Sequence, residues 1–279
     1  MTGAEAADGG PRRFVPPLRA AVDRAAFDHP LFAGIAGFGD LLTAADWPRV
    51  VDLDARLALP GKRFVEQDAA LLADGLHYET RIAEGRIATR AGNWHDLFNA
   101  LVWARYLPIK CALNAQQCRH IEGMAAGQRN RAQAALTQFD ETGVVVRVRD
   151  PALLAAWDAH QWRVLFEPIH WQSGRIAIAA VFGHALMEQA LLPGRLLVGK
   201  CVVLQGDDDA GCIDTVARAI RRAGCCSIPW NCARCHWRVF PAGTPARRQP
   251  FTRTTIISVR CAKGAAIRRR FSRTGPMPG

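Results

Sequence analysis

Residues 93–103 read Asn-Trp-His-Asp-Leu-Phe-Asn-Ala-Leu-Val-Trp, and this stretch predicts the helix from which the rest of the fold can be worked out. Asn93 is a good N-cap residue for a predicted helix over residues 94–106, which stops before a proline. The leucine, phenylalanine and valine side chains share one apolar face of this helix. His95 and Asn99 lie one turn apart on another face. The stretch therefore predicts a helix with one face for the core and one face that carries polar groups.

The segments on either side of this helix predict further helices and a few short strands. Alternating side chains from Leu76 to Arg90 indicate a β-hairpin that turns at residues 83–85, and short β runs are expected at residues 144–146 and 201–204. Apolar spacing of three to four predicts helices over residues 18–27, 31–42, 44–53, 113–126, 129–139, 150–166, 176–192 and 213–220.

The fold class that follows is α+β, a predominantly helical single domain with a small antiparallel sheet or hairpin. Residues 176–192 are almost entirely apolar, which favours a central, buried helix. Residues 1–15 are expected to be a flexible leader and residues 16–220 the domain. The chain contains no βαβ alternation, no GxGxxG motif and no P-loop, so nucleotide-binding folds are not expected.

No membrane partner is expected for this chain. A membrane-spanning helix needs about 18 uninterrupted apolar residues, and no stretch reaches that length. The first ten residues, MTGAEAADGG, carry acids where a secretory signal has basic residues followed by an apolar core. The expected location is therefore the cytoplasm.

The positive charge of the chain comes from its last fifth. The formal net charge is +11, which by itself suggests a nucleic-acid partner. Residues 221–279 hold 13 lysines and arginines, no acids and no leucine, so residues 1–220 carry 23 basic and 25 acidic side chains. The tail also contains five of the nine cysteines. Such a change in composition at one point indicates either a new domain or a new reading frame.

A shifted reading frame accounts for the tail. Each new codon takes the last base of one codon and the first two of the next, with GC-rich third bases where the code leaves a choice. Residues 226–243 then become LLDPMELRPLPLAGIPGW, and residues 254–260 become DDDYFRP. Acidic residues and leucines return together. We therefore interpret residues 221–279 as a frameshifted, basic tail and expect it to be poorly ordered.

One motif in the tail depends on that interpretation. Residues 232–236, Cys-Ala-Arg-Cys-His, have the CxxCH spacing that attaches c-type haem, and with Cys225 and Cys226 they could be drawn as a zinc knuckle. Haem attachment requires export, and zinc sites normally use a second spaced pair rather than adjacent cysteines. The arginines at 268–270 resemble a nucleic-acid patch. In a frameshifted tail these features are accidents, and a nucleic-acid partner is not expected.

The strongest candidate site follows the predicted hairpin. His95 and Asp96 could supply a proton acceptor or metal ligands at the start of a helix, together with Asn99, while Lys110 could stabilise an anion. The structural alternative is that Asn93 or Asp96 caps the helix and His95 makes a buried hydrogen bond. Neither a cofactor nor a partner is identified by these residues.

A second candidate pair lies in the apolar segment at residues 176–192. His184 and Glu188 are at i and i+4, so on one helix they would form a hydrogen-bonded pair with shifted pKa values, suited to acid–base chemistry. The structural alternative is a satisfied polar pair that fixes the position of the helix. The spacing is not that of a zinc-protease HExxH motif.

Several motifs resemble one bacterial family, which is known as domain of unknown function 3025. They are YETRI (78–82), GRIATR (85–90), NWHDLFNALVW (93–103), P-x-K (108–110), AALTQFDETG (134–143) and FGHALME (182–188). Members of that family close with GVPGW-like and YFRP-like segments, which the shifted reading of the tail supplies. The resemblance covers about residues 15–220 and implies a fold but no reaction.

Three function classes remain open from the sequence. The first is a binding or scaffold protein whose polar residues are structural. The second is a metal-assisted hydrolase of a phosphate or amide substrate that uses His95, Asp96, Asn99, Lys110 and His120. The third is a tail that binds zinc, haem or nucleic acid. The hydrolase hypothesis requires the polar residues to converge in one pocket with His184 or Glu188 close by.

Overall fold

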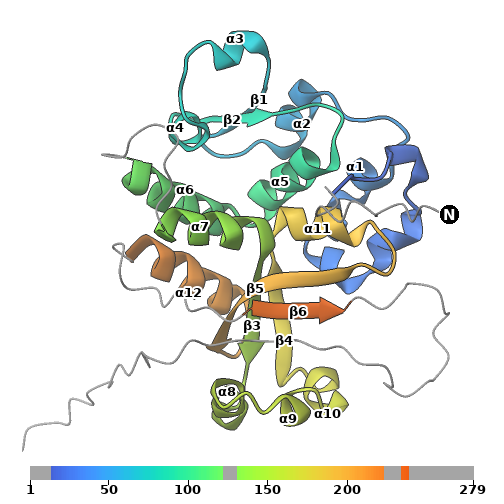
Figure 1. Ribbon diagram of the computed structural model, residues 1–279, viewed down its shortest axis with the longest axis vertical. Coiled ribbons are helices and arrows are strands. Elements are labelled where there is room, and N and C mark those ends of the chain that lie inside the picture. The colour runs from blue at the N-terminus through green and yellow to red at the C-terminus, as the bar shows by residue number, and fades with distance from the viewer. Residues whose placement is uncertain (1–13, 122–130, 223–233, 239–279) are drawn as a thin grey trace, which may run out of the picture.

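The computed structural model describes residues 14–121, 131–222 and 234–238, and it shows an α+β fold in which most of the regular structure is helical (Figure 1). The predicted fold class is confirmed. No helix in these described ranges is long and apolar enough to cross a membrane.

The elements are named in chain order. Short 3-10 helices occupy the N-terminal region: η1 (Arg19–Ala21), η2 (Arg24–Asp28) and η3 (Pro30–Phe38). The first α-helices are α1 (Gly39–Thr43), α2 (Val50–Leu57), α3 (Ala69–Leu72), α4 (Tyr78–Ala83), α5 (Trp94–Arg105) and α6 (Leu107–Ile121). The later α-helices are α7 (Arg131–Thr142), α8 (Pro151–Asp158), α9 (Trp162–Leu165), α10 (Pro168–Gln172), α11 (His184–Ala190) and α12 (Asp209–Arg222). The strands are β1 (Arg63–Glu66), β2 (Arg86–Thr89), β3 (Gly143–Val148), β4 (Ile176–Val181), β5 (Leu196–Gln205) and β6 (Arg234–Arg238).

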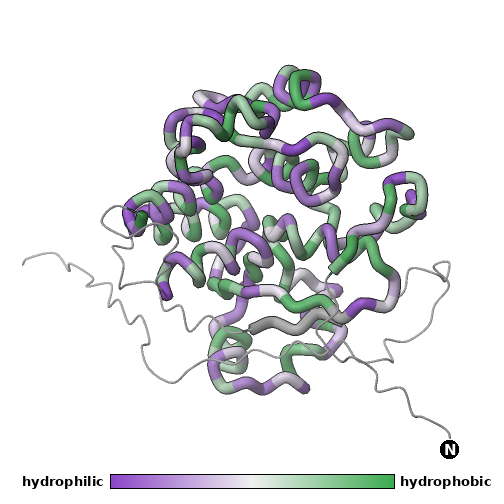
Figure 2. Tube along the Cα trace, turned by 45° about the horizontal axis from the view of Figure 1, so that its top comes forward, coloured by the Kyte–Doolittle hydropathy of each residue, from purple (hydrophilic) through white to green (hydrophobic). Residues whose placement is uncertain are grey.

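Strand β3 lies inside a mixed sheet with the order β4-β3-β5-β6. It runs antiparallel to β4 and parallel to β5, so that Val145 faces Ala180 on one side and Val202 on the other. Every residue of β3 is buried, because strands cover both of its edges and helices pack on the sheet. The valine run predicted as a short strand is therefore an interior strand of the sheet. Figure 2 shows hydrophobic residues along this strand region and alternating hydropathy along the surrounding helices.

The predicted hairpin over residues 76–90 is wrong. Its first half is helix α4, and its second half is β2, which pairs in parallel with β1, a strand about twenty residues upstream. Gly85, with φ at +94°, is the turn between helix and strand instead of a hairpin turn. Only residues 86–89 of the predicted hairpin form a strand, and the partner of that strand, β1, lies outside the predicted segment.

The predicted buried helix over residues 176–192 is also wrong. Its first six residues, Ile-Ala-Ile-Ala-Ala-Val, form β4, and a helix begins only at His184. A short apolar run that ends near a glycine suits a buried strand as well as a helix, and periodicity alone does not separate the two. Here strand β3 is available as a partner, and it decides the outcome.

The helices downstream of residue 93 follow the predictions more closely. Helix α5 begins at Trp94, and the side chain of Asn93 caps it by accepting a hydrogen bond of 2.9 Å from the backbone N–H of Asp96. Helix α8 begins with the predicted Asp150 cap and proline, but it ends at Asp158 and is followed by the short helix α9. The predicted N-terminal α-helices are mostly 3-10 segments instead.

Two glycines bring the end of α7 against the start of α11. Gly143 and Gly183 are adjacent in space, since the backbone N–H of Gly183 donates to the carbonyl of Gly143 over 3.1 Å. A Cβ added at Gly183 would lie 2.5 Å from the backbone of Thr142. Because neither position carries a side chain, the two backbones touch, and His184 begins its helix directly beside the last turn of α7.

The tail is described over only one segment. Strand β6 lies antiparallel to β5, with Val198 opposite His236. The remaining tail features lie outside the described residues, including Cys225, Cys226, Cys232 and the arginines at 268–270. The predicted leader is described only from Phe14 onward.

Candidate functional site

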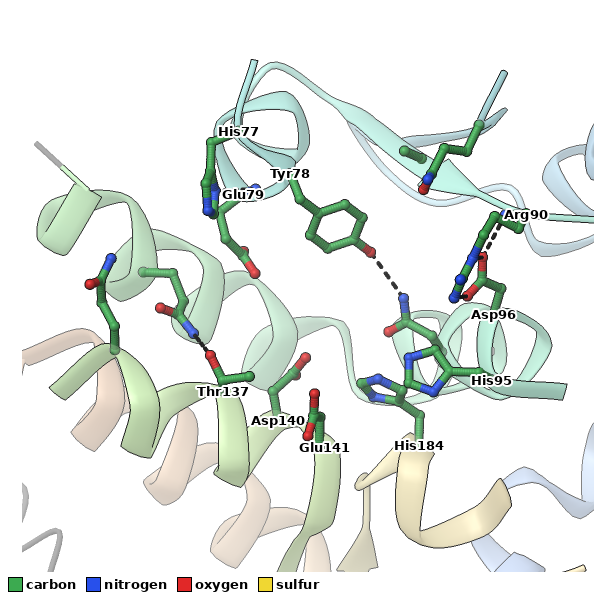
Figure 3. Close-up of a pocket in the computed structure, with 15 residues that line it drawn as sticks. His77, Tyr78, Glu79, Arg90, His95, Asp96, Thr137, Asp140, Glu141 and His184 are labelled. Atoms are coloured by element: carbon green, nitrogen blue, oxygen red, sulfur yellow. Dashed lines mark hydrogen bonds and ion pairs between the residues drawn. The ribbon is translucent and has the colours of Figure 1, made fainter. Parts of the chain in front are cut away.

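A pocket of about 310 Å³ lies between α4, α5, α7 and α11. Figure 3 shows its labelled side chains pointing into a common space from helices that are far apart in the sequence. Four of the residues proposed from the sequence line it: His95, Asp96, Asn99 and His184. Of the other three, Lys110 and Glu188 do not line the pocket, but each contacts a lining residue. His120 is not among the described lining residues.

His95 is held by a buried carboxylate. Its Nδ1 atom lies 3.4 Å from Oε2 of Glu188, whose side chain is 10% exposed, whereas the His95 side chain is 32% exposed. The pairing joins the first turn of α5 to α11. With Nδ1 turned toward Glu188, the other ring nitrogen, Nε2, is the one available to a molecule in the pocket. The predicted partner of Glu188 was His184, and the structure places His95 there instead.

His184 is a neutral neighbour of His95. The two rings are 4.6 Å apart at 76°, an edge-to-face arrangement. Burial lowers the pKa of His184 well below its usual value, and the charges of Lys110 and His95 lower it further, although a hydrogen bond to the backbone of Asp140 opposes them. Its Nδ1 atom is buried and has no hydrogen-bond partner. His184 therefore packs against His95 without adding a second positive charge.

Asp96 is held by the segment that leaves β2. Its carboxylate accepts a hydrogen bond of 2.5 Å from the backbone N–H of Arg90 and is gripped by the Arg90 guanidinium at 2.8 and 3.1 Å. The hydrogen bond to Asp96 raises the pKa of Arg90 above its usual value. Both carboxylate oxygens of Asp96 accept hydrogen bonds from Arg90, and these bonds join α5 to the segment that follows β2. This agrees with the structural interpretation of Asp96, while the Ncap position belongs to Asn93.

Lys110 is also committed to an ion pair. Its Nζ atom lies 2.6 and 2.8 Å from the two oxygens of Asp140, with side-chain exposures of 4% for Lys110 and 23% for Asp140. The same ammonium lies 5.2 Å from the ring centroid of Trp103. Lys110 thus joins α6 to α7 and holds Asp140 in the pocket wall, and it does not itself line the pocket.

Asn99 and Tyr78 form a hydrogen-bonded pair in the pocket wall. The Nδ2 atom of Asn99 donates to the hydroxyl of Tyr78 over 3.1 Å, and this bond is the dashed line that begins at the Tyr78 oxygen in Figure 3. The Oδ1 atom of Asn99 is buried and has no partner. Burial raises the pKa of Tyr78 far above its usual value of 10, with help from Glu79 and Asp140, so this hydroxyl keeps its proton.

The position of Tyr78 depends on contacts between α4 and α6. The Nδ2 atom of Asn114 donates to the carbonyl oxygen of Glu79 at 2.8 Å and to its carboxylate at 2.7 Å. His77 caps the helix by accepting a hydrogen bond from the backbone N–H of Glu79. These contacts place the first turn of α4, and with it Tyr78, over the pocket.

The described residues do not provide a metal site. In residues 14–121, 131–222 and 234–238, no group of three or more histidine, cysteine, aspartate or glutamate side chains is arranged to hold a metal ion. His95, Asp96 and Asn99 lie in one pocket, as the hydrolase hypothesis required. Asp96 is paired with Arg90, however, and His95 is paired with Glu188. The chemistry that this arrangement supports is proton transfer at His95.

Two pocket residues, Tyr78 and Arg90, were given no site role by the sequence. Tyr78 had been assigned to a strand, where its side chain would have had no defined neighbour. The YETRI and GRIATR motifs that contain Tyr78 and Arg90 were visible. They would have been the signal, since conspicuous polar residues inside a motif indicate a site as often as a fold.

Comparison with known proteins gives a family but no relative of known activity. No curated protein and no solved structure matches the chain. A family model matches residues 62–222, more than half of the chain, and this range contains all the described residues that line the pocket. The chain belongs to the family described as "Protein of unknown function (DUF3025)".

Proposed function

We propose that the pocket is the active site of a hydrolase in which His95 is the general base. The observation that carries the proposal is the 3.4 Å approach of His95 Nδ1 to the buried carboxylate of Glu188, in a residue pair that joins two helices. A carboxylate on one side of an imidazole fixes which nitrogen carries the proton and directs the other toward the substrate. In this role Glu188 is a positioning residue and His95 is the catalytic residue.

The surroundings favour a base that becomes positively charged during the reaction. Glu188 stabilises the imidazolium that forms on His95 when it takes a proton. His184, which touches His95, stays neutral because its pKa is lowered by burial and by Lys110. The positive charge on His95 therefore meets one carboxylate and no second imidazolium.

The reaction that follows needs only water as co-reactant. Nε2 of His95 takes a proton from a water molecule, and the water oxygen bonds to the electrophilic atom of the substrate. The bond to the leaving group then breaks, and the proton on His95 passes to the leaving group. No step is routed through a metal ion. The proposal keeps the cytoplasmic location expected from the sequence.

The second candidate function is ligand binding without turnover. It is favoured by two ion pairs, because Asp96 binds Arg90 and Lys110 binds Asp140. A structural role for Asp96 and Lys110 predicts such pairs. A binding protein would use the same pocket but would not depend on the proton-accepting nitrogen of His95.

Hydrolysis of p-nitrophenyl phosphate and of a primary amide, acetamide, whose turnover is followed as ammonia release, by the purified full chain separates these functions. We expect His95→Gln to lower the rate on at least one reporter by about 100-fold or more, the usual range for loss of a general base. Glu188→Gln should lower the same rate mainly through kcat, because the imidazolium that forms on His95 loses its neighbouring negative charge. His120→Gln, a histidine change outside the pocket, is the matched control. Equal rates for wild type and His95→Gln on both reporters would leave the binding function.

A further inference from the structure

The side chain of Asn99 has one polar atom in use and one that is not. Its residue is 9% exposed, its Nδ2 atom donates to Tyr78, and its Oδ1 atom is buried without a partner. Leaving a buried acceptor unpaired is costly, so such an atom needs an explanation, and a ligand that completes it is one. Asn99 lines the pocket, so a bound molecule is the partner that this atom can acquire.

Tyr78 adds the complementary group. Because its oxygen accepts a hydrogen bond from Asn99, its own O–H is directed to another partner. The Tyr78–Asn99 pair therefore presents one donor, the hydroxyl, and one acceptor, Oδ1, side by side. If the carboxamide is rotated by 180°, Tyr78 donates to Oδ1 of Asn99. The Tyr78 oxygen can then accept a hydrogen bond from a ligand and Nδ2 can donate one, so the pair still presents one donor and one acceptor.

We infer that the Tyr78–Asn99 pair binds the amide edge of the substrate, which is a primary carboxamide or a lactam. The substrate carbonyl oxygen accepts a hydrogen bond from Tyr78, and the adjacent substrate N–H donates to Oδ1 of Asn99. A primary amide and a lactam carry these two groups on one edge, whereas an ester or a phosphate has no N–H and leaves Oδ1 unpaired. Specificity of this kind is strong, because the wrong substrate leaves a buried polar group without a partner.

The Tyr78–Asn99 pair lies close to His95, the general base of the proposed function. The reaction step below rests on that proposed function, whereas the binding step does not. Asn99 follows His95 by one turn of α5, and both line the pocket. Water gives a proton to His95, and its oxygen bonds to the amide carbon while the carbonyl electrons move to the oxygen held by Tyr78. When this intermediate collapses, the C=O bond forms again and the C–N bond breaks. The nitrogen takes the proton from His95, so a primary amide gives a carboxylic acid and ammonia, and a lactam opens to a single amino acid.

Binding of three small rings to the full chain tests the subsite. The probes are 2-pyrrolidinone, N-methyl-2-pyrrolidinone and γ-butyrolactone, of which only the first has an N–H beside its carbonyl. We expect 2-pyrrolidinone to bind at least tenfold more tightly than the other two, as measured by NMR titration of the protein amides. His95→Gln should bind it as wild type does, which separates this inference from the proposed catalysis.

Variants of the pair complete the test. Asn99→Leu, close to the same volume without polar atoms, and Tyr78→Phe, which keeps the ring, should each weaken 2-pyrrolidinone binding about tenfold, while His120→Gln should not. Equal affinity for the three rings, or no binding of 2-pyrrolidinone, overturns the subsite even if His95 proves essential. Selective binding by a chain whose reporter rates do not need His95 supports the subsite and overturns the hydrolase.

Discussion

Strand β3 and the helices around the pocket are both buried, but they are filled by different kinds of side chain. The valines of β3 are at most 1% exposed, and they meet other apolar residues. The buried polar residues on α5, α6, α7 and α11 are Asp96, Asn99, Lys110, Asn114, Gln116, Gln117, Gln133, His184 and Glu188. Volume and shape determine whether an apolar core is stable, whereas buried polar groups must also be paired.

This difference shows which region carries specificity. Most of the buried polar groups around the pocket have defined partners, as Lys110 has in Asp140 and Asp96 has in Arg90. Among the described residues, the unpaired buried polar atoms include two in the pocket wall, Oδ1 of Asn99 and Nδ1 of His184. The pairs hold the wall in place, and the two unpaired atoms belong to side chains that line the pocket.

The largest effect is expected where the two regions meet. In Gly183→Ala the new Cβ would lie 2.5 Å from the Thr142 backbone, which cannot rotate away as a side chain can. We expect the free energy of unfolding to fall by about 3 kcal/mol and His95-dependent hydrolysis to be lost, because α11 carries Glu188. Denaturant unfolding measures the first effect. The control is Gly37→Ala, where no atom lies within 4 Å of the new Cβ. Equal stability of the two variants would contradict the close approach.

A smaller effect is expected from breaking an ion pair of the wall. Lys110→Met leaves Asp140 without its cation, and we expect a loss of about 2 kcal/mol, less than for a fully buried pair because the Asp140 side chain is 23% exposed. The double variant Lys110→Met with Asp140→Asn should lose less than the two single variants together. Thermal unfolding of the four proteins measures the coupling, and strict additivity would show that the pair contributes nothing.

The smallest effect depends on pH and distinguishes His184 from an apolar core residue. Folded His184 stays neutral, so as the pH falls below the usual value of 6.5 only the unfolded chain takes up this proton. The free energy of unfolding therefore falls by up to about 1.4 kcal/mol for each pH unit below 6.5. Above pH 6.5 His184 makes no contribution to the pH dependence of stability. His184→Gln should lack this part of the pH dependence. Unfolding measured at pH 7.5 and pH 5.5 gives the difference, and identical slopes for the two proteins would mean that His184 titrates normally when folded.

The sequence predicted those parts of the fold whose signals are local. Helix α5 was predicted from its Asn93 cap and its apolar spacing, and α12 and β3 were predicted in nearly the right places. Of the site, His95, Asp96 and Asn99 were identified from a dense polar cluster around the start of a helix, and His184 was identified as a polar residue in an apolar segment. Tyr78 was not, because the segment around it was assigned to the wrong kind of element.

What the sequence determined by itself was the chemistry that was available: a mostly helical α+β chain, a helix with polar residues on one face, and a buried histidine and glutamate one turn apart. Only the tertiary structure decided the pairing. In the folded chain Glu188 pairs with His95 rather than with His184, and Asp96 pairs with Arg90. Residues 176–181 form a strand beside β3. The physical reason is that caps and periodicity act within a few residues, whereas strand pairing and buried ion pairs depend on groups that only the folded chain brings together.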